Sequence, residues 1–240
     1  MATLSQRLVP GVVGISTFVD YVYQRDMQLT AVRMAGTKGP INQLRTVTVT
    51  LDFNGLVANL KAGAMEAAEE QVADACRALE AAGADFLVVT SGTTSTLTAR
   101  ARERVAIPFL DLAEACWTDG GPPEPVGLLC TRYAAAGGVF QAAADRVGAT
   151  LILPTAGTAE RVDRAIFDEL IWGDVSEGCV RTLRTAIAEL VENGAASIIL
   201  GNTDMTLAAE RLQETAAVPL IDAARAHARA AARAALDGRL

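Results

Sequence analysis

The chain has 240 residues, which is enough for one large domain or two small ones, and its 51% hydrophobic content excludes a disordered protein. Its formal net charge is -7, whereas nucleic-acid binders need a basic excess to contact phosphates, so we expect no nucleic-acid partner. One histidine, His227, and four separated cysteines without a CxxC pair exclude a His-rich metal site, a zinc ribbon and a thioredoxin motif.

The first apolar stretch, from Leu8 to Ile15, is interrupted by Pro10, Gly11 and Gly14. It is too short to span a membrane and lacks the form of a signal peptide. The other apolar runs have the length of strands. We therefore expect a cytoplasmic protein with reduced thiols and no membrane partner.

Short apolar runs alternate along the chain with longer Ala-rich amphipathic stretches. The apolar runs are typical of strands buried on both faces; in chain order they are 12–15, 46–53, 86–89, 126–130, 150–153 and 197–200. The amphipathic stretches predict helices at 64–82, 94–104, 134–147, 159–170, 177–193, 207–215 and 222–236. Gly83 and Gly194 stand just past two of these helices, as C-cap glycines do. The alternation predicts an α/β fold with parallel sheets flanked by helices.

An internal repeat divides the chain into two similar halves. The segment 83–93 matches 194–204 with a constant offset of 111 residues, and the match continues from Pro108 over Pro219. The shared order is helix, Gly-Ala, strand, polar turn, helix and a strand that begins at Val-Pro or Ile-Pro. We interpret this as an internal duplication with pseudo-symmetric lobes at 1–117 and 118–240, partly exchanged at the C-terminus.

The segment 118–125, rich in Gly and Pro, is the expected crossing point between the lobes. Because ligands of open α/β sheets bind beyond the carboxyl ends of the strands, we expect an active-site cleft between the lobes. The turns that follow two equivalent strands, 90–95 and 202–206, are expected to face it.

The first of these turns gathers hydroxyl residues around Gly92, and the second reads Gly201-Asn202-Thr203-Asp204. Hydroxyls and backbone N–H groups at the start of a helix can hold an anion. The alternative interpretation is ordinary helix capping, because Ser, Thr, Asn and Asp cap helices in all classes of protein.

The chain resembles the aspartate/glutamate racemase superfamily over nearly its whole length, and is similar to the aspartate racemase branch. The stretches that carry the resemblance are Val-Thr-Leu-Asp-Phe-Asn at 49–54, Gly-Ala-Asp-Phe-Leu-Val-Val at 83–89, Leu-Leu-Cys-Thr-Arg-Tyr at 128–133, Ile-Phe-Asp-Glu-Leu-Ile-Trp-Gly at 166–173, Ile-Leu-Gly-Asn-Thr-Asp at 199–204 and Val-Pro-Leu-Ile-Asp-Ala-Ala-Arg-Ala-His at 218–227. The resemblance implies a duplicated, two-lobed α/β fold, a small carboxylate or amino acid as substrate, no cofactor and no metal. It also makes a homodimer possible.

Members of this superfamily use one cysteine from each lobe to remove and return the proton on the substrate's α-carbon. Thiols suit this task because their pKa lies near neutrality. In this chain the two positions fall on Ser91 and Asn202. A hydroxyl is a much weaker base than a thiol, and an amide is no base. We expect Cys76, Cys116, Cys130 and Cys179 to be buried structural residues instead.

The resemblance places a carboxylate-binding set and several proton-transfer candidates on the remaining residues. Donors to the substrate carboxylate, or to an enediolate derived from it, would come from the substrate-binding set Asn54, Gly92, Thr93, Thr94, Thr131 and Thr203. Turn or cap chemistry is the alternative for each threonine. The catalytic candidates are Ser91, Asn202, Asp204, His227 and Tyr133, although a lone histidine is as often a core or surface residue.

Three functions follow from these residues. The first is a cofactor-independent isomerase or lyase that works on a small carboxylate without thiols. A superfamily relative that decarboxylates arylmalonates also lacks the first thiol and has a Gly-Thr-Ser turn there, which Gly92-Thr93-Thr94 resembles with a shift of one position; that relative keeps its second cysteine, whereas this chain has Asn202. The second is a non-catalytic carboxylate-binding protein. The third is a residual racemase or epimerase that uses Ser91 and an unidentified partner.

Overall fold

The computed structural model describes residues 7–34 and 43–240, which form two compact units. Unit 1 comprises Met1–Thr90, Leu97–Asp111 and His227–Leu240, and unit 2 comprises Ser91–Thr96 and Leu112–Ala226. The lobe expected at 1–117 includes residues 1–6 and 35–42, which lie outside the described residues. In the described part of the chain, no helix is long and apolar enough to cross a membrane.

Unit 1 is built on a parallel sheet of three strands in the order β2-β1-β3. The strands are β1 (Pro10–Gly14), β2 (Val47–Thr50) and β3 (Phe86–Val89), and Leu87 makes a further parallel bridge to Phe109. The helices of this unit are α1 (Thr17–Met34), α2 (Phe53–Lys61), α3 (Met65–Ala81), α5 (Ala99–Arg104) and most of α12 (Ala223–Asp237).

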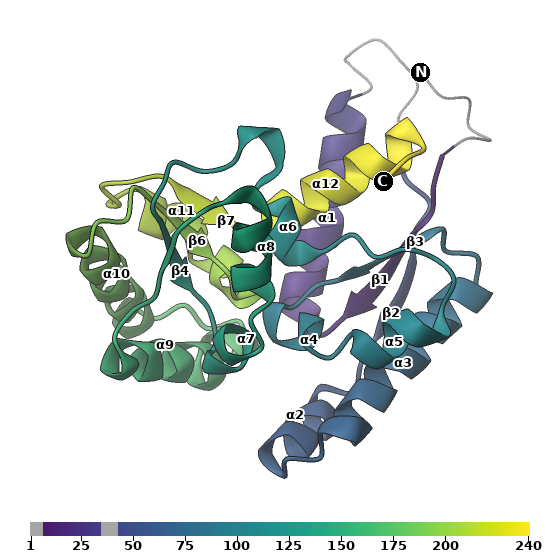
Figure 1. Ribbon diagram of the computed structural model, residues 1–240, viewed down its shortest axis with the longest axis horizontal. Coiled ribbons are helices and arrows are strands. Elements are labelled where there is room, and N and C mark those ends of the chain that lie inside the picture. Colours follow the sequence, from purple (N-terminus) through teal and green to yellow (C-terminus); the bar gives the residue numbers. More distant parts are fainter. Residues whose placement is uncertain (1–6, 35–42) are drawn as a thin grey trace. The chain divides into compact units, whose positions relative to one another are not determined.

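Both faces of the unit 1 sheet are covered, because successive side chains of a strand point to opposite faces. Val13 and Leu87 pack with α3 in one apolar cluster, while Val12 and Phe86 pack with α1 and α12 in another. Figure 1 shows α12, in yellow, running beside α1, in purple, although the two helices are nearly 200 residues apart in sequence. Strands β1 and β3 are fully buried and nearly continuous in apolar character, as the sequence predicts. The prediction was wrong for β2, because Thr48 and Thr50 alternate with its valines and are exposed.

Unit 2 is built on a parallel sheet of four strands in the order β5-β4-β6-β7. The strands are β4 (Val126–Leu129), β5 (Leu151–Ile152), β6 (Ser197–Leu200) and β7 (Leu220–Asp222). Its helical elements are α4 (Gly92–Ser95), α6 (Leu112–Ala115), η2 (Thr118–Gly120), α7 (Arg132–Ala136), α8 (Val139–Val147), α9 (Ala156–Asp168), η3 (Leu170–Trp172), α10 (Glu177–Glu192), η4 (Thr203–Leu207) and α11 (Ala209–Gln213). Two apolar clusters cover the two faces of this sheet: α9 and α10 belong to one, α6 and α8 to the other.

The sequence repeat is also a repeat of hydrogen bonds within the two units. Leu87 N donates to Pro108 O at 2.8 Å, and Ile198 N, 111 residues later, donates to Pro219 O at 3.0 Å. Gly83 and Gly194 have φ of 87° and 95°, so both occupy the left-handed region expected of a C-cap glycine. Equivalent glycines thus follow the equivalent helices α3 and α10, and equivalent backbone hydrogen bonds are made by β3 and β6.

Several expected elements are shorter than the sequence suggested, and three helices were missed. The expected strand 46–53 ends at Thr50, and Phe53 begins α2, so the prediction was wrong for the last residues of that run. The expected helix 94–104 is two short helices, because the Thr96 hydroxyl donates to the Thr93 carbonyl at 2.7 Å and ends α4. The expected helix 134–147 is likewise broken, at Gly137 and Gly138. Helices α1, α2 and α6 were not predicted.

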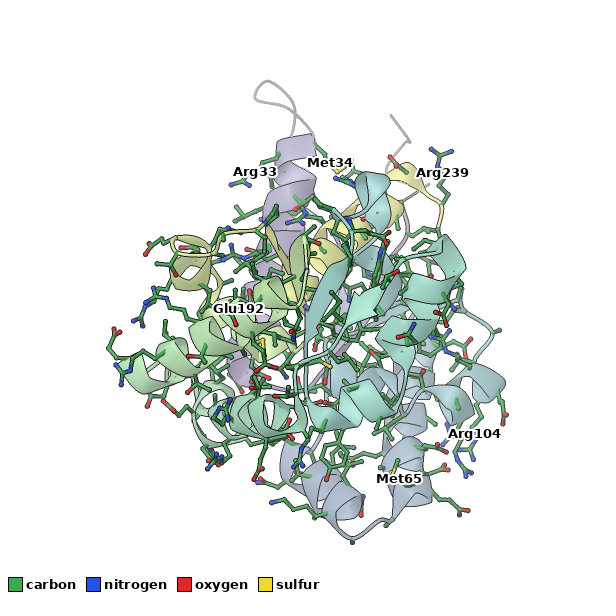
Figure 2. The ribbon with its side chains drawn as sticks, turned by 60° about the vertical axis from the view of Figure 1, so that its left-hand side comes forward. Arg33, Met34, Met65, Arg104, Glu192 and Arg239 are labelled. Atoms are coloured by element: carbon green, nitrogen blue, oxygen red, sulfur yellow. The ribbon has the colours of Figure 1, made fainter. Side chains whose placement is uncertain are left out.

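Side chains at the ends of several helices project outward from the two units. Figure 2 shows Met65 at the start of α3 and Arg104 at the end of α5, both on unit 1, and Glu192 at the end of α10 on unit 2. Arg104 forms an ion pair with Glu70 of α3, which joins two helices on one face of the unit 1 sheet.

Candidate functional site

The turns that follow β3 and β6 lie against each other in unit 2. A Cβ on Gly92 would stand 2.6 Å from the Gly201 carbonyl oxygen, and a Cβ on Gly201 would stand 2.9 Å from the Phe140 ring. Neither residue can therefore carry a side chain without displacing its neighbour. We name residues 91–96 and 201–206 together the turn pair.

The Thr93 hydroxyl of the turn pair is hydrogen-bonded to Thr131, which follows β4. The Oγ1 atoms of Thr93 and Thr131 lie 2.7 Å apart, and Thr131 Oγ1 also accepts from Ala134 N at 3.1 Å. Thr131 directly follows Cys130 at the end of β4 and is 1% exposed, so the hydroxyl contact is held at the carboxyl edge of the unit 2 sheet. The structure thus brings together Thr93 and Thr131, two of the residues that the resemblance assigns to the substrate-binding set.

Ser91 and Asn202 occupy equivalent cap positions in the two turns. The Ser91 hydroxyl oxygen accepts from Thr94 N at 3.2 Å, and this is its one side-chain hydrogen bond to the residues that the structure describes. The Asn202 side chain accepts from Asp204 N at 3.1 Å and donates to Asp204 Oδ2 at 3.3 Å. Both residues are buried, and Asp204 holds the Asn202 amide in one orientation.

The other residues expected at the site fall into different surroundings. Thr94 and Thr203 are buried within the turn pair, and Tyr133 on α7 is 43% exposed. Asn54, the second residue of α2, belongs to unit 1 and is exposed.

His227 also belongs to unit 1, where it is fully buried. One ring nitrogen, Nε2, lies 2.7 Å from Leu110 O, and the ring packs edge-on against Tyr23 with a centroid distance of 5.5 Å. Burial lowers the pKa of His227 to about 4, although the hydrogen bond to Leu110 opposes the shift. A neutral, enclosed imidazole of this kind is a packing element of the core of unit 1.

All four cysteines are free and buried, as the sequence predicts. Burial raises the pKa of Cys76 to about 12, of Cys130 to about 12 and of Cys179 to about 11. These three thiols are therefore protonated at neutral pH. Thiolate chemistry by them is excluded under ordinary conditions.

Arg132, the cation that follows Thr131 in sequence, forms an ion pair with a carboxylate. Arg132 Nε donates to Asp163 Oδ2 at 2.6 Å, and Arg132 N donates to Asp163 Oδ1 at 3.0 Å. Within the described residues, no three His, Cys, Asp or Glu side chains gather in a metal-binding group. The polar atoms that the turn pair offers are therefore hydroxyl, amide and backbone groups together with Asp204.

The sequence did not point to Asp20, the buried carboxylate of α1. Asp20 is 8% exposed and its Oδ1 accepts from Ile15 N at 3.2 Å and from Thr90 Oγ1 at 2.9 Å. A signal was present, because Asp20 stands one residue after Val19 and three before Tyr23, on the apolar face of the helix. Burying an acidic side chain on the apolar face of a helix costs free energy unless hydrogen bonds or a charge partner compensate for it.

Comparisons with known proteins agree with this architecture. The family model for Asp/Glu/Hydantoin racemases matches residues 27–231. A crystal structure from Yersinia pestis, assigned to the Asp/Glu racemases, is 27% identical with a TM-score of 0.80, and the match covers 95% of this chain and 99% of that chain.

More distant solved structures share the fold alone. An aspartate racemase homologue from Pyrococcus horikoshii is 20% identical with a TM-score of 0.73, over 96% of this chain and 99% of that chain. The glutamate racemase of Aquifex pyrophilus is 14% identical with a TM-score of 0.63, over 93% of this chain and 82% of that chain. Because the family model matches most of its length, this chain belongs to the Asp/Glu/Hydantoin racemase family.

Proposed function

We propose that the chain is a cofactor-independent enzyme of the isomerase or lyase type, and that it acts on a small carboxylate with hydroxyl and amide groups where relatives use thiols. The observation that carries this proposal is the contact between the hydroxyls of Thr93, in the turn pair, and Thr131, at the N-cap of α7, which lie 2.7 Å apart. Two hydroxyls that already share one proton can turn a second proton toward an anionic oxygen.

The chemistry that suits this set is stabilisation of negative charge. When a carbon next to a carboxylate loses a proton or a substituent, charge moves onto the carboxylate oxygens, and fixed donors lower the energy of that state. Thr93, Thr131 and the Asn202 amide are donors of this kind. Asp204 keeps the amide oriented, since it binds Asn202 at both ends of the side chain.

Substitutions of Ser91 and Asp204 test the proposal most directly. Ser91 stands where the family carries its first cysteine, and its hydroxyl is held by Thr94 N. Tyr133 remains a candidate proton donor, because its phenol is partly exposed and lies two residues after Thr131. We assign no catalytic role to His227, whose ring is enclosed in unit 1.

A second function, a non-catalytic carboxylate-binding protein, is favoured by one observation. No carboxylate or imidazole of the described residues hydrogen-bonds to Ser91 Oγ, so no base is in place to activate it. The binding set is the same in both functions, and turnover alone separates them. A residual racemase would differ from both by inverting its substrate.

The test measures binding and turnover separately. Calorimetric titration with succinate and malonate tests binding, while incubation with the enantiomers of aspartate and glutamate, with methylmalonate and with allantoin tests turnover by NMR and carbon dioxide release. We expect binding together with at least one product, and loss of turnover in Ser91→Ala and Asp204→Asn with the fold retained. Turnover at the native rate in both variants would refute the site; binding without any product would leave the non-catalytic function.

A further inference from the structure

Asp222 stands at the carboxyl edge of the unit 2 sheet, where the second turn of the turn pair, residues 201–206, begins. Strand β7 lies beside β6 in this sheet (Figure 1), and Asp222, the last residue of β7, is the register partner of Leu200, the last residue of β6. The chain passes directly from Leu200 into the turn that carries Asn202. Because parallel strands end at the same edge of a sheet, the Asp222 side chain and this turn are neighbours within unit 2.

Both oxygen atoms of the Asp222 carboxyl group are engaged within unit 2. The Thr206 hydroxyl donates to Oδ2 at 2.6 Å, which is the short distance of a charge-assisted hydrogen bond. The backbone N–H of Arg225 donates to Oδ1 at 3.1 Å, so Asp222 also caps the start of α12. The Arg225 guanidinium lies 3.4 Å from Oδ2 and pairs with Glu210 of α11 at 3.0 Å. These contacts fix the orientation of the carboxyl group.

Thr206 connects this carboxyl group to the Asn202 amide through one short element. Both Thr206 and Asp204 belong to η4, a 3-10 helix of five residues, and Asp204 holds the Asn202 side chain by hydrogen bonds at 3.1 and 3.3 Å. Short 3-10 helices have poorly aligned hydrogen bonds, so side-chain contacts help to keep them in place. The described contacts supply two: Met205 is buried in the apolar cluster with α9 and α10, and Thr206 binds Asp222.

The two halves of the internal repeat differ at this position. Asp111, the equivalent carboxylate of the first half, forms an ion pair with Arg102 of α5 in unit 1. The Ser95 hydroxyl, which is the counterpart of the Thr206 hydroxyl, donates to the Ser91 carbonyl of its own turn at 2.7 Å. Equivalent side chains thus have different partners, so the duplicated fold alone does not require the contact between Thr206 and its carboxylate.

We propose that Asp222 is a positioning residue: through Thr206 it holds the second turn in the place from which the Asn202 amide donates to the charge that develops on the substrate carboxylate. This inference rests on the proposed function. A donor stabilises a developing charge best when it is held in place before the reaction begins, and a displacement of about 1 Å can lower a rate about 100-fold. Asp222 acts through the turn and touches no reacting atom. Its loss should therefore lower kcat and leave KM nearly unchanged.

Two variants remove the contact without removing the cap of α12. Thr206→Val replaces the hydroxyl with a methyl group, and Asp222→Ser keeps a capping oxygen for Arg225 N while it removes the oxygen that Thr206 binds. With the acid that the native protein turns over, we expect both variants to lower kcat about 10- to 100-fold. Thr206→Ser keeps the hydroxyl and should recover most of the rate that Thr206→Val loses. Asp111→Ser is the matched control, because it makes the same change at the equivalent position of the repeat, and its kcat should equal that of the native protein.

A second measurement does not depend on turnover. The two Nδ2 protons of Asn202, assigned by NMR, exchange with water at a rate that reports how firmly the amide is held. We expect this exchange to be about 10-fold faster or more in Thr206→Val and in Asp222→Ser, and unchanged in Asp111→Ser.

Native kcat in Thr206→Val, or native exchange at the Asn202 amide in both variants, overturns the inference and leaves the proposed function standing. A loss of rate that merely follows the fraction of unfolded protein, measured by circular dichroism, overturns it as well. Absence of turnover in the native protein removes the proposed function and the catalytic part of the inference with it. The exchange of the Asn202 amide then still decides whether Asp222 holds the second turn.

Discussion

The Oγ1 atoms of Thr93 and Thr131 lie 2.7 Å apart, although the two residues follow different strands and stand 38 positions apart in sequence. Thr131 also caps α7 by accepting from Ala134 N. Replacing Thr131 with Val removes the cap and the hydroxyl contact without changing the shape of the side chain. We expect a loss of about 1–2 kcal/mol in the free energy of unfolding, measured by urea denaturation. Thr131→Ser keeps the hydroxyl and should lose much less; equal losses in the two variants would contradict the role of the hydroxyl.

Gly92 permits the close approach of the two turns. Gly92→Ala places a methyl group 2.6 Å from the Gly201 carbonyl oxygen, and we expect it to cost about 1–3 kcal/mol of stability. Gly157→Ala is the matched control, because its nearest neighbour is the end of the Arg161 side chain at 3.7 Å and it stands inside α9. That change should be neutral or stabilising by roughly 0.5–1 kcal/mol. A tolerated Gly92→Ala would mean that the turns can separate at no cost.

The buried cysteines predict a protein whose thiols do not react in the folded state. At pH 7.5 we expect a thiol reagent to leave the native protein nearly unmodified over a time in which the unfolded protein gains four labels. The reason is that all four cysteine side chains are buried and that the pKa values of Cys76, Cys130 and Cys179 are raised. Mass spectrometry counts the labels. Rapid labelling of one cysteine in the folded protein would show a thiol able to take part in the reaction.

The pKa of His227 predicts an acid-sensitive contribution to stability. The pKa in the folded state, about 4, lies below the ordinary value of 6.5, so folding favours the neutral ring. Its contribution is fully present above pH 6.5 and is lost as the pH falls from 6.5 toward 4. At about 1.4 kcal/mol per unit, the loss is up to about 3 kcal/mol.

The matched variant is His227→Gln, which keeps a donor for Leu110 O but does not titrate. We expect the free energy of unfolding of the native protein to fall more steeply than that of the variant between pH 7 and pH 4.5. The comparison isolates His227 because both proteins retain Asp20, whose raised pKa changes stability in the opposite direction over the acidic range. Parallel curves for the two proteins would mean that the ring is not held neutral.

The sequence predicted the strands best where they are buried on both faces. The ranges 86–89 and 197–200 coincide with β3 and β6, because four consecutive apolar or small residues follow a C-cap glycine in each. Helix α1 was missed because its exposed face carries Phe18, Tyr21 and Leu29 beside the buried Val19 and Tyr23, which blurs the apolar periodicity.

The sequence predicted the location of the two turns of the candidate site, but not the contact between them. The turns that carry Ser91 and Asn202 could be located by the repeat and by the resemblance, but their contact through Gly92 and Gly201 depends on packing around Phe140. Asp20 was missed because helix α1 was not predicted, so its place between the buried Val19 and Tyr23 could not be recognised. Its burial follows from the way that β1, β2 and β3 end around it, which is a property of the folded sheet.

The central claim is that this family member turns over a small carboxylate without thiols. The most direct test measures solvent-deuterium exchange at the α-carbon of each acid, once with untreated protein and once with protein that has been exposed to a thiol reagent. We predict labelling of the α-carbon of at least one acid in the panel, at the same rate before and after the reagent, and a rate lower by about 100-fold or more in Ser91→Ala. Exchange that stops when cysteines are modified in the folded protein would contradict the claim, and so would succinate binding with no exchange of any acid.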